Sequence, residues 1–245
     1  SLQQYLKEKN ITWVSDPSNS NEDFERISQR KTWTILKSKG FSENRIELSA
    51  DHMRRAHEAL NHMLPIHFKS IGKQEITDLL WEYNSFVSLP EEFKLRLISA
   101  VVMWNGNVHY RPRFKAVLNV LKNINEKKAV VLGGSIFYYN AGKIRVTIEY
   151  QSVKKNTVSC ISGLVWRNIW KVKREIKDGY ITAIGIDGNK QLSKQQRSTM
   201  PYRSRIIQPG IFVKEKLLIA PTLDSDSSEY LSFCGIKFND FLHNH

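Results

Sequence analysis

The stretch that sets the architecture of this chain covers residues 135–150 and reads SIFYYNAGKIRVTIEY. Apolar and polar side chains alternate from Ile144 to Tyr150, and a period of two is typical of a strand with one buried face. The strand-like run Ser135–Tyr139 comes before it, and the segment Asn140–Lys143 between them has the composition of a tight turn. These residues therefore predict an antiparallel β-hairpin.

Further strand-like segments follow this hairpin and predict a β-rich domain over residues 126–245. A short helix is expected at Leu192–Thr199, ahead of Pro201. A second hairpin is expected where Lys214-Glu215-Lys216 separates two short apolar runs. The strand candidates, including these two runs, are Leu164–Val172, Tyr180–Ile186, Ile211–Val213 and Leu217–Ile219.

The chain before the hairpin has a helical period, so a small helical domain is expected over residues 42–125. Ser49 has the side chain of a helix N-cap, and Pro65 is expected to end or kink the helix after it. Apolar residues at helical spacing predict further helices, the last two beginning near Pro90 and Pro112. These residues lie within 76–83, 93–102 and 117–124.

The first piece, residues 1–41, is expected to hold two helices joined by a turn. The turn is Asp16–Asn21, and the longer helix runs from Asn21 or Glu22 to a stop at Gly40. With the two pieces that follow, the chain is expected to belong to the α+β class.

The composition is that of an ordinary globular protein with an excess of positive charge. Of 245 residues, 41% are hydrophobic and 25% are charged, enough to bury one large core or two smaller ones. Lys and Arg outnumber Asp and Glu by 37 to 24, and the net charge of +13 favours a nucleic-acid partner. The longest apolar runs are too short to cross a bilayer, and no signal peptide is visible. Because the sequence lacks an initiator Met, we expect it to be the middle of a longer protein, although residues left from cloning would look the same.

The residues alone indicate no complete catalytic site. Gly133-Gly134-Ser135 precedes a strand-like run and not a helix, so a glycine bulge in a hairpin is favoured over a phosphate loop. Cys160 and Cys234 lie among apolar neighbours and are expected to be buried, reduced thiols. Four histidines recur every five residues. On a helix this spacing places them on different faces, so they are not expected to converge on one metal ion. They are His52, His57, His62 and His67.

Two groups of cations, the first among aromatic residues, make a candidate RNA-binding surface. Cations neutralise phosphates and aromatic faces stack unpaired bases, so this mixture suits folded RNA with an open loop. The alternative stays open that the tryptophans are core residues and the cations a solvated face. The first group is Arg167, Lys171, Lys173, Arg174 and Lys177, among Trp166, Trp170 and Tyr180. The second group is Lys190, Lys194, Arg197, Arg203 and Arg205.

The segment Trp13–Asn19, followed by an aromatic residue and by Arg26 and Arg30, is similar to the signature of the tRNA(Ile)-lysidine synthetase family. That signature closes the α/β ATP-pyrophosphatase domain of the family and leads into a connecting helix. This chain departs from it at Asn21, where Asp is usual, and at Ile27, where many members have Asn.

Weaker matches to the family extend over most of the chain. In a run that resembles the family's Trp-Asp-x-Arg-Phe, Arg167 replaces the Asp and Ile169 replaces the Arg. The other matches are Val131–Gly134 with Glu149, Ala183–Gly188, Ile211-Phe212 and Ala220-Pro221.

The resemblance implies a parent enzyme that converts the wobble cytidine of the tRNA(Ile) anticodon to lysidine. In the family, ATP with magnesium adenylates the base, and the amine of L-lysine then displaces AMP. The family's ATP loop, Ser-Gly-Gly-x-Asp-Ser, precedes the signature and is not found here. The resemblance therefore implies a cytoplasmic tRNA-binding fragment that is inactive alone and holds neither ATP nor magnesium.

The resemblance also implies a role for each piece. Residues 1–41 would end the ATP-pyrophosphatase domain and form the connecting helix, residues 42–125 would be a helical tRNA-binding domain, and residues 126–245 a β-rich C-terminal domain. A stand-alone basic RNA-binding module without catalysis, or a basic protein-interaction domain, stays as an alternative.

Candidate site residues follow from the signature and from the cation groups. Arg26 and Arg30 lie one helical turn apart on one face, where they would hold a phosphate or pair with Asp16. The structural pairing is favoured for Asp16, and contact with RNA or nucleotide for Arg30. The RNA- or nucleotide-proximal residues are Asp16, Asn19, Arg26 and Arg30, and the tRNA-binding residues are Arg167, Lys171, Lys173, Arg174, Lys194, Arg197, Arg203 and Arg205.

Overall fold

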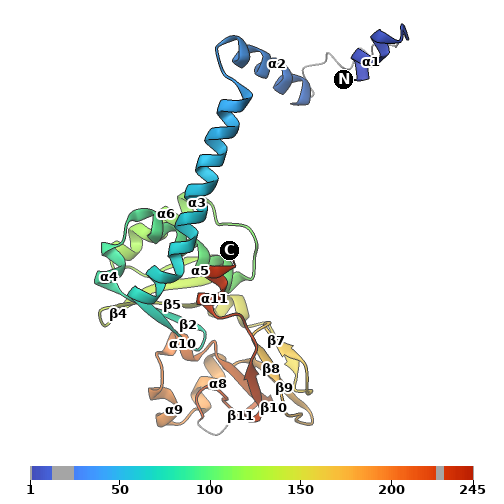
Figure 1. Cartoon of the computed structure of the whole chain (residues 1–245). Coiled ribbons are helices and arrows are strands. Elements are labelled where there is room, and N and C mark those ends of the chain that lie inside the picture. The colour runs from blue at the N-terminus through green and yellow to red at the C-terminus, as the bar shows by residue number, and fades with distance from the viewer. Residues whose placement is uncertain (1, 13–24, 225–228, 245) are drawn as a thin grey trace. The chain divides into compact units, whose positions relative to one another are not determined.

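The computed structural model describes residues 2–12, 25–224 and 229–244, and the chain divides into two compact units, residues 1–57 and 58–245. The labels of Figure 1 number the helices and strands in chain order, where there is room for a label. The α+β class is confirmed, because helices accompany antiparallel sheets. Among the described residues, no helix is both long enough and apolar enough to cross a membrane.

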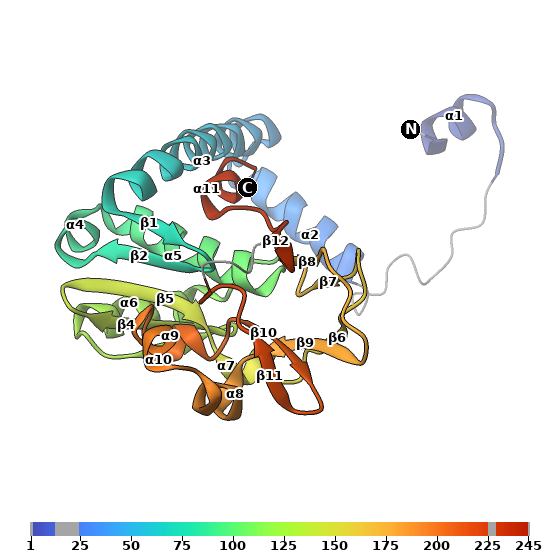
Figure 2. The same ribbon diagram turned by 90° about the horizontal axis from the view of Figure 1, so that it is seen from below.

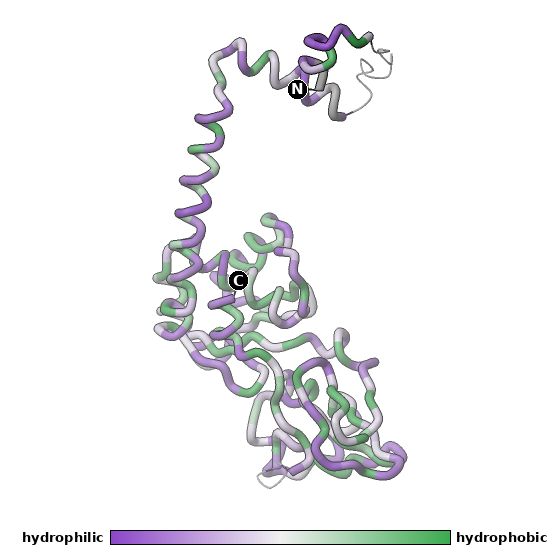
Figure 3. Tube along the Cα trace, turned by 45° about the vertical axis from the view of Figure 1, so that its right-hand side comes forward, coloured by the Kyte–Doolittle hydropathy of each residue, from purple (hydrophilic) through white to green (hydrophobic). Residues whose placement is uncertain are grey.

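The first unit contains α1 (Leu2–Glu8), α2 (Glu25–Ser38) and the beginning of α3 (Glu43–Ile71). The helix stop at Gly40 is confirmed, since this residue has a left-handed φ of +88° after α2. None of the described residues before Glu58 is buried. Figure 3 shows hydrophobic and hydrophilic residues mixed along this part of α3, where Leu48 and Met53 are exposed.

The structure corrects the predicted N-cap of α3 and shows that α3 does not end at Pro65. Ser42, not Ser49, caps the helix: the Ser42 hydroxyl accepts a hydrogen bond from Arg45 N at 3.2 Å. The Ser49 hydroxyl donates to the carbonyl of Arg45 at 2.8 Å from inside the helix. The helix also continues past Pro65 to Ile71, because the residues that follow the proline are buried in the core of the second unit and offset its cost.

A five-stranded antiparallel sheet forms the centre of the second unit, with strand order β1-β2-β5-β4-β3. The predicted hairpin is confirmed: β4 pairs with β5 around a turn in which Ala141 and Gly142 have φ values of 47° and 83°. The strands are β1 (Gly72–Glu75), β2 (Asp78–Glu82), β3 (Val130–Leu132), β4 (Ser135–Asn140) and β5 (Lys143–Ile148).

The helix predicted over residues 76–83 is wrong, because β1 and β2 form a hairpin there. The turn passes through Ile76 in a left-handed conformation, and the first four residues of β2 are all buried. A short strand buried on both faces has no alternation, so its apolar residues imitate a helical spacing. Gly72 permits the pairing, since a Cβ there would lie 1.9 Å from the Leu80 carbonyl oxygen.

The helices between residues 58 and 125 and the C-terminal helix share one hydrophobic core with this sheet. Trp81, Leu97, Phe137 and Phe238 are fully buried in it, although they come from all parts of the unit. The core therefore does not divide at the expected boundary after Asn125. Its helices, besides the end of α3, are α4 (Tyr83–Ser88), α5 (Glu91–Gly106), α6 (Phe114–Asn125) and the C-terminal α11 (Phe238–His243).

The β-rich remainder contains two small antiparallel sheets, ordered β11-β10-β9-β6 and β12-β8-β7 (Figure 2). The predicted β10–β11 hairpin and the short helix before Pro201 are confirmed. The strands are β6 (Val158–Ser159), β7 (Val165–Trp166), β8 (Trp170–Val172), β9 (Gly179–Ala183), β10 (Pro209–Val213), β11 (Lys216–Ile219) and β12 (Leu231–Phe233). The helices are α7 (Tyr150–Val153), α8 (Gly185–Gln191), α9 (Lys194–Ser198) and α10 (Tyr202–Arg205).

Two of the expected strands are shorter than predicted. Leu164–Val172 is not one strand but the hairpin β7–β8, which turns at Arg167 and Asn168, both with φ of 56°. The strand expected over Tyr180–Ile186 ends at Ala183, because α8 begins at Gly185 with a left-handed φ of 67°.

A buried ion pair joins β2 to β5. Arg145 Nη1 donates to Asp78 Oδ2 at 2.7 Å, and the two side chains are 12% and 3% exposed. Arg145 also contacts the half-exposed Glu75 at 3.3 Å. Nearby, Gln208 Nε2 donates to Thr77 Oγ1 at 3.1 Å, so the β1–β2 hairpin is also tied to the segment after α10.

We expect Asp78→Ala to lower the free energy of unfolding by about 3 kcal/mol, because it leaves the Arg145 charge buried without its main partner. The matched control is Glu75→Gln, which removes the more exposed carboxylate and is expected to cost no more than about 1 kcal/mol. Urea unfolding of both variants measures the difference. Equal stability of the two would show that the pair does not hold the sheet.

Candidate nucleic-acid interface

The tryptophans of the first cation group belong to the core. Trp166 is fully buried and donates from Nε1 to the Asn156 carbonyl at 2.9 Å, while Trp170 packs edge-on against Phe233. These rings therefore do not offer a face to RNA bases. Lys171, which lies between buried neighbours in β8, is exposed on the outer side of the strand.

The segment after β8 carries the exposed cations of this group. Lys173, Arg174 and Lys177 are all exposed. Arg174 pairs with Glu229 at 3.1 Å and lies over the Tyr230 ring at 5.3 Å. An exposed pair of this kind contributes little stability, so a phosphate competes with it readily.

The second cation group lies on α8, α9 and α10. A capping box holds α9 in place: Ser193 Oγ accepts from Gln196 N at 3.2 Å, and Gln196 Oε1 accepts from Ser193 N at 2.8 Å. Lys194 and Arg197 on this helix are exposed, as is Arg203 on α10, whose guanidinium lies 5.5 Å from the Tyr138 ring centroid. These short helices thus present three cations outward.

Arg205 differs from the other cations, because it is buried. Its Nε donates to Asn189 Oδ1 at 2.7 Å, and its Nη1 donates to the carbonyls of Met200, at 2.9 Å, and of Arg197. Burial lowers the pKa of Arg205. Its donors fasten α8, α9 and α10 together, which makes it a structural residue within the RNA-binding set that the sequence indicates.

The signature residues lie in the first unit. Arg26 and Arg30 are one turn apart on α2, and Arg30 is exposed. Asp16 and Asn19 fall outside the described residues, so their pairing with an arginine stays a prediction.

The glycine pair is a hairpin turn. Gly133 and Gly134, with φ of 55° and 75°, join β3 to β4, which confirms the hairpin interpretation over the phosphate loop. A Cβ on Gly133 would lie 2.5 Å from Val102 Cγ1, so close packing against α5 also requires glycine there. Among the described residues, no group of three or more His, Cys, Asp or Glu side chains is placed to hold a metal ion.

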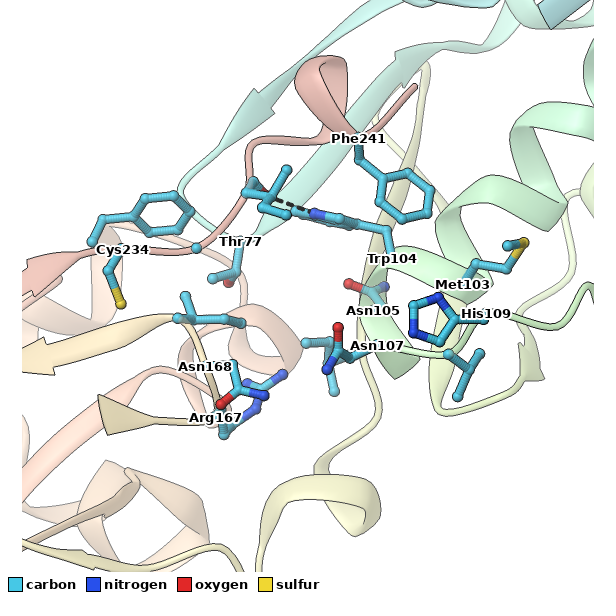
Figure 4. A pocket seen from close by; sticks show the side chains of 16 residues that line it. Thr77, Met103, Trp104, Asn105, Asn107, His109, Arg167, Asn168, Cys234 and Phe241 are labelled. Atoms are coloured by element: carbon cyan, nitrogen blue, oxygen red, sulfur yellow. Dashed lines mark hydrogen bonds between the residues drawn. The ribbon is translucent and has the colours of Figure 1, made fainter. Parts of the chain in front are cut away.

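A cavity of about 300 Å³ lies between the end of α5, the β7–β8 turn and the segment that leads from β12 to α11. Figure 4 shows Trp104 and Phe241 on one wall and Arg167 with Asn168 on the opposite wall. The residues of the first cation group are therefore not equivalent, because Arg167 faces this cavity.

The loop after α5 borders the cavity and was missed by the sequence reasoning. Residues 107–113 read NVHYRPR, and Tyr110 in this loop is 89% exposed. The loop begins at Asn107, whose left-handed conformation ends α5. The sequence feature that indicates a nucleic-acid contact here is Tyr110, an aromatic residue among His109, Arg111 and Arg113, just before a helix.

The two cysteines differ in exposure. Cys160 is 1% exposed, as expected, whereas Cys234 is exposed and lines the cavity, so its predicted burial is wrong. The physical reason is that β12 ends at Phe233. Beyond this strand end, the backbone N of Cys234 donates a hydrogen bond to the Ile169 carbonyl in the β7–β8 hairpin at 2.8 Å, while the side chain of Cys234 is exposed.

We expect a thiol reagent such as N-ethylmaleimide to modify one cysteine of the folded protein quickly and the other only after unfolding. The fast site is Cys234, because Cys160 is closed to solvent. Mass spectrometry of the digested protein identifies the modified residue. Equal rates at both positions would contradict the packing around Cys160.

Comparison with known proteins gives one consistent result. No family model matches the chain. The tRNA(Ile)-lysidine synthase of Ruegeria pomeroyi is 29% identical over 221 residues, which are 90% of this chain and 52% of that protein. Those of Wolbachia pipientis wMel and Bartonella quintana are 28% and 23% identical over 53% and 70% of this chain, and over 30% and 36% of their own lengths.

This chain spans about half the length of the first of these curated relatives. A match of that extent is consistent with a C-terminal portion of such a protein. The resemblance indicated by the turn and its arginines is therefore confirmed, and the chain is similar to tRNA(Ile)-lysidine synthases over most of its length.

Proposed function

We propose that this chain is the tRNA-binding portion of a tRNA(Ile)-lysidine synthase, an ATP-dependent ligase. The observation that carries the proposal is the similarity to these enzymes over 90% of the chain. In the proposal, the parent enzyme modifies the wobble cytidine of tRNA(Ile) in the cytoplasm, with ATP and L-lysine as substrates. This chain holds the tRNA while another part of the parent performs the chemistry.

The charge distribution supports a role in holding RNA. The net charge is +13, and Lys171, Lys194, Arg197 and Arg203 are exposed on strands and helices of the second unit. Contacts to phosphates fix the position of a nucleic acid without reading its sequence. Such contacts suit the recognition of a folded tRNA by its shape.

The glycine pair of this chain is not an ATP-binding loop. The glycine pair at Gly133 and Gly134 forms a β-turn, and β4, not a helix, follows it. The proposal therefore assigns ATP and magnesium to the rest of the parent enzyme. The exposed apolar residues Leu48 and Met53 on α3 suit a connecting segment that contacts that other part.

The alternative is a stand-alone basic RNA-binding module without catalysis. The two proposals differ in what the gene encodes ahead of Ser1. A reading frame that contains Ser-Gly-Gly-x-Asp-Ser upstream supports the ligase, and a natural protein that begins at Ser1 would contradict it.

We expect the affinity of the chain for tRNA(Ile) to fall by about a thousandfold between about 50 mM and 200 mM salt, the loss that about six phosphate contacts produce. Filter binding at increasing salt measures this dependence. A flat response, or no binding at low salt, would remove the basis for an RNA-binding role.

We expect Arg203→Ala to weaken binding about fivefold for several different tRNAs and to reduce the slope of the logarithmic salt dependence by about 1. The reason is that a phosphate contact carries no sequence information. Lys122→Ala is the matched control, since Lys122 is an exposed cation on α6 outside both cation groups. A loss confined to one tRNA would show that Arg203 reads a base instead.

A further inference from the structure

We infer that the cavity between α5 and the β7–β8 turn receives one unpaired nucleotide of the bound RNA, with its phosphate on Arg167 and its base beside Trp104. This inference deepens the proposed function and rests on it. It concerns a site distinct from the exposed cation groups, which contact only the outside of a folded RNA.

Arg167 is the cation at this cavity. It lies in the β7–β8 turn with φ of 56°, and its guanidinium carbon lies 5.3 Å from the centroid of the Trp166 ring. Among the residues that the structure describes, none accepts a hydrogen bond from the guanidinium or forms an ion pair with it. Figure 4 shows the group pointing into the cavity.

The surroundings of Arg167 favour a bound anion. Burial lowers the pKa of Arg167 to about 10, so the side chain is still charged at neutral pH but has lost part of its hydration. A half-buried cation that lacks an acceptor is costly, and a phosphate would satisfy it through two parallel hydrogen bonds. Trp166 behind the guanidinium holds its planar face in position.

The opposite wall suits a base. Trp104 Nε1 donates to the Ile236 carbonyl at 2.8 Å, which fixes the half-buried indole beside the cavity. Asn105 Nδ2 donates to Ser135 Oγ at 3.0 Å, and Figure 4 shows its carbonyl oxygen on the cavity side. Asn107 and Asn168 add two more amides, and amides offer the paired donor and acceptor that base edges need.

The size of the cavity selects a single nucleotide. About 300 Å³ is at the lower limit of small-molecule sites, and it excludes a base pair or a helix. The exposed Tyr110 and the cations Arg111 and Arg113 continue the same chemistry outside the cavity, where a single strand would run. A free nucleoside monophosphate has the same chemistry, so the experiment must separate the two sources.

The first arm uses free nucleotides on the full chain. The four nucleoside monophosphates, cytidine and inorganic phosphate are each titrated, and the rate of Cys234 modification by N-ethylmaleimide is followed, since Cys234 lines the cavity. We expect monophosphates to slow this modification severalfold, cytidine and phosphate to do so less, and Arg167→Asn to weaken the protection at least tenfold. Asn is chosen because it accepts the left-handed conformation of the turn. For Arg167→Lys, which keeps the charge, we expect protection of Cys234 between that of the unchanged protein and that of Arg167→Asn. Lys122→Met is the matched control that also loses one charge. In this variant, we expect monophosphates to protect Cys234 as well as they do in the unchanged protein.

Thermal stability separates a binding role from a structural one. Arg167→Asn removes a poorly solvated charge, so its melting temperature is expected to equal or exceed that of the unchanged protein. A lowered melting temperature with unchanged nucleotide protection would show that Arg167 is only structural and would overturn the inference.

The second arm uses tRNA at low salt with the same variants. We expect tRNA to protect Cys234 and Arg167→Asn to bind tRNA severalfold more weakly than Lys122→Met does. If tRNA binds but neither tRNA nor monophosphates protect Cys234, the cavity inference fails while the proposed function stands. If the unchanged protein binds no tRNA, the proposed function fails. Protection by monophosphates alone would then assign the cavity to a free nucleotide and overturn the RNA inference.

Discussion

The antiparallel pairing of β2 with β5 is the interaction on which the rest of the second unit depends. It brings Asp78 to within 2.7 Å of Arg145, 67 positions away, and buries both side chains almost completely. The pairing makes one sheet out of two hairpins that are distant in sequence, and the helices on both sides of residue 125 share its core. The first sheet thus shares its core with the helices, whereas residues between Ile148 and Leu231 pack in a second hydrophobic cluster.

The positive charge serves two purposes. Arg145 and Arg205 donate hydrogen bonds to other groups of the protein. Arg145 links two strands, and Arg205 links α8, α9 and α10. Lys194, Arg197 and Arg203 stand on elements that Arg205 holds together, and their side chains face solvent. A buried cation thus positions the exposed ones, which is how a surface of short helices can hold a polyanion in a fixed geometry.

Under the proposed function, the cavity adds a second kind of recognition to this surface. Exposed cations respond to the shape and charge of an RNA, whereas a cavity with one arginine and several amides responds to an individual nucleotide. Both lie in the unit that begins at Glu58, while Arg26 and Arg30 lie in the other unit, on α2. Within the proposed ligase, the residues that bind the tRNA and the signature that resembles the end of the ATP-pyrophosphatase domain therefore belong to different units.

Local sequence determined the hairpins at residues 135–148 and 209–219, the stop of α2 at Gly40 and the family resemblance, because each depends on neighbours within a few positions. Only the tertiary structure decided that residues 72–82 pair as strands, since a strand buried on both faces carries no period of its own. The same holds for the burial of Arg205, the exposure of Cys234 and the cavity at Arg167. These features arise where segments that are far apart in the sequence come into contact. Charge counts and local residue spacing do not tell which distant segments will meet.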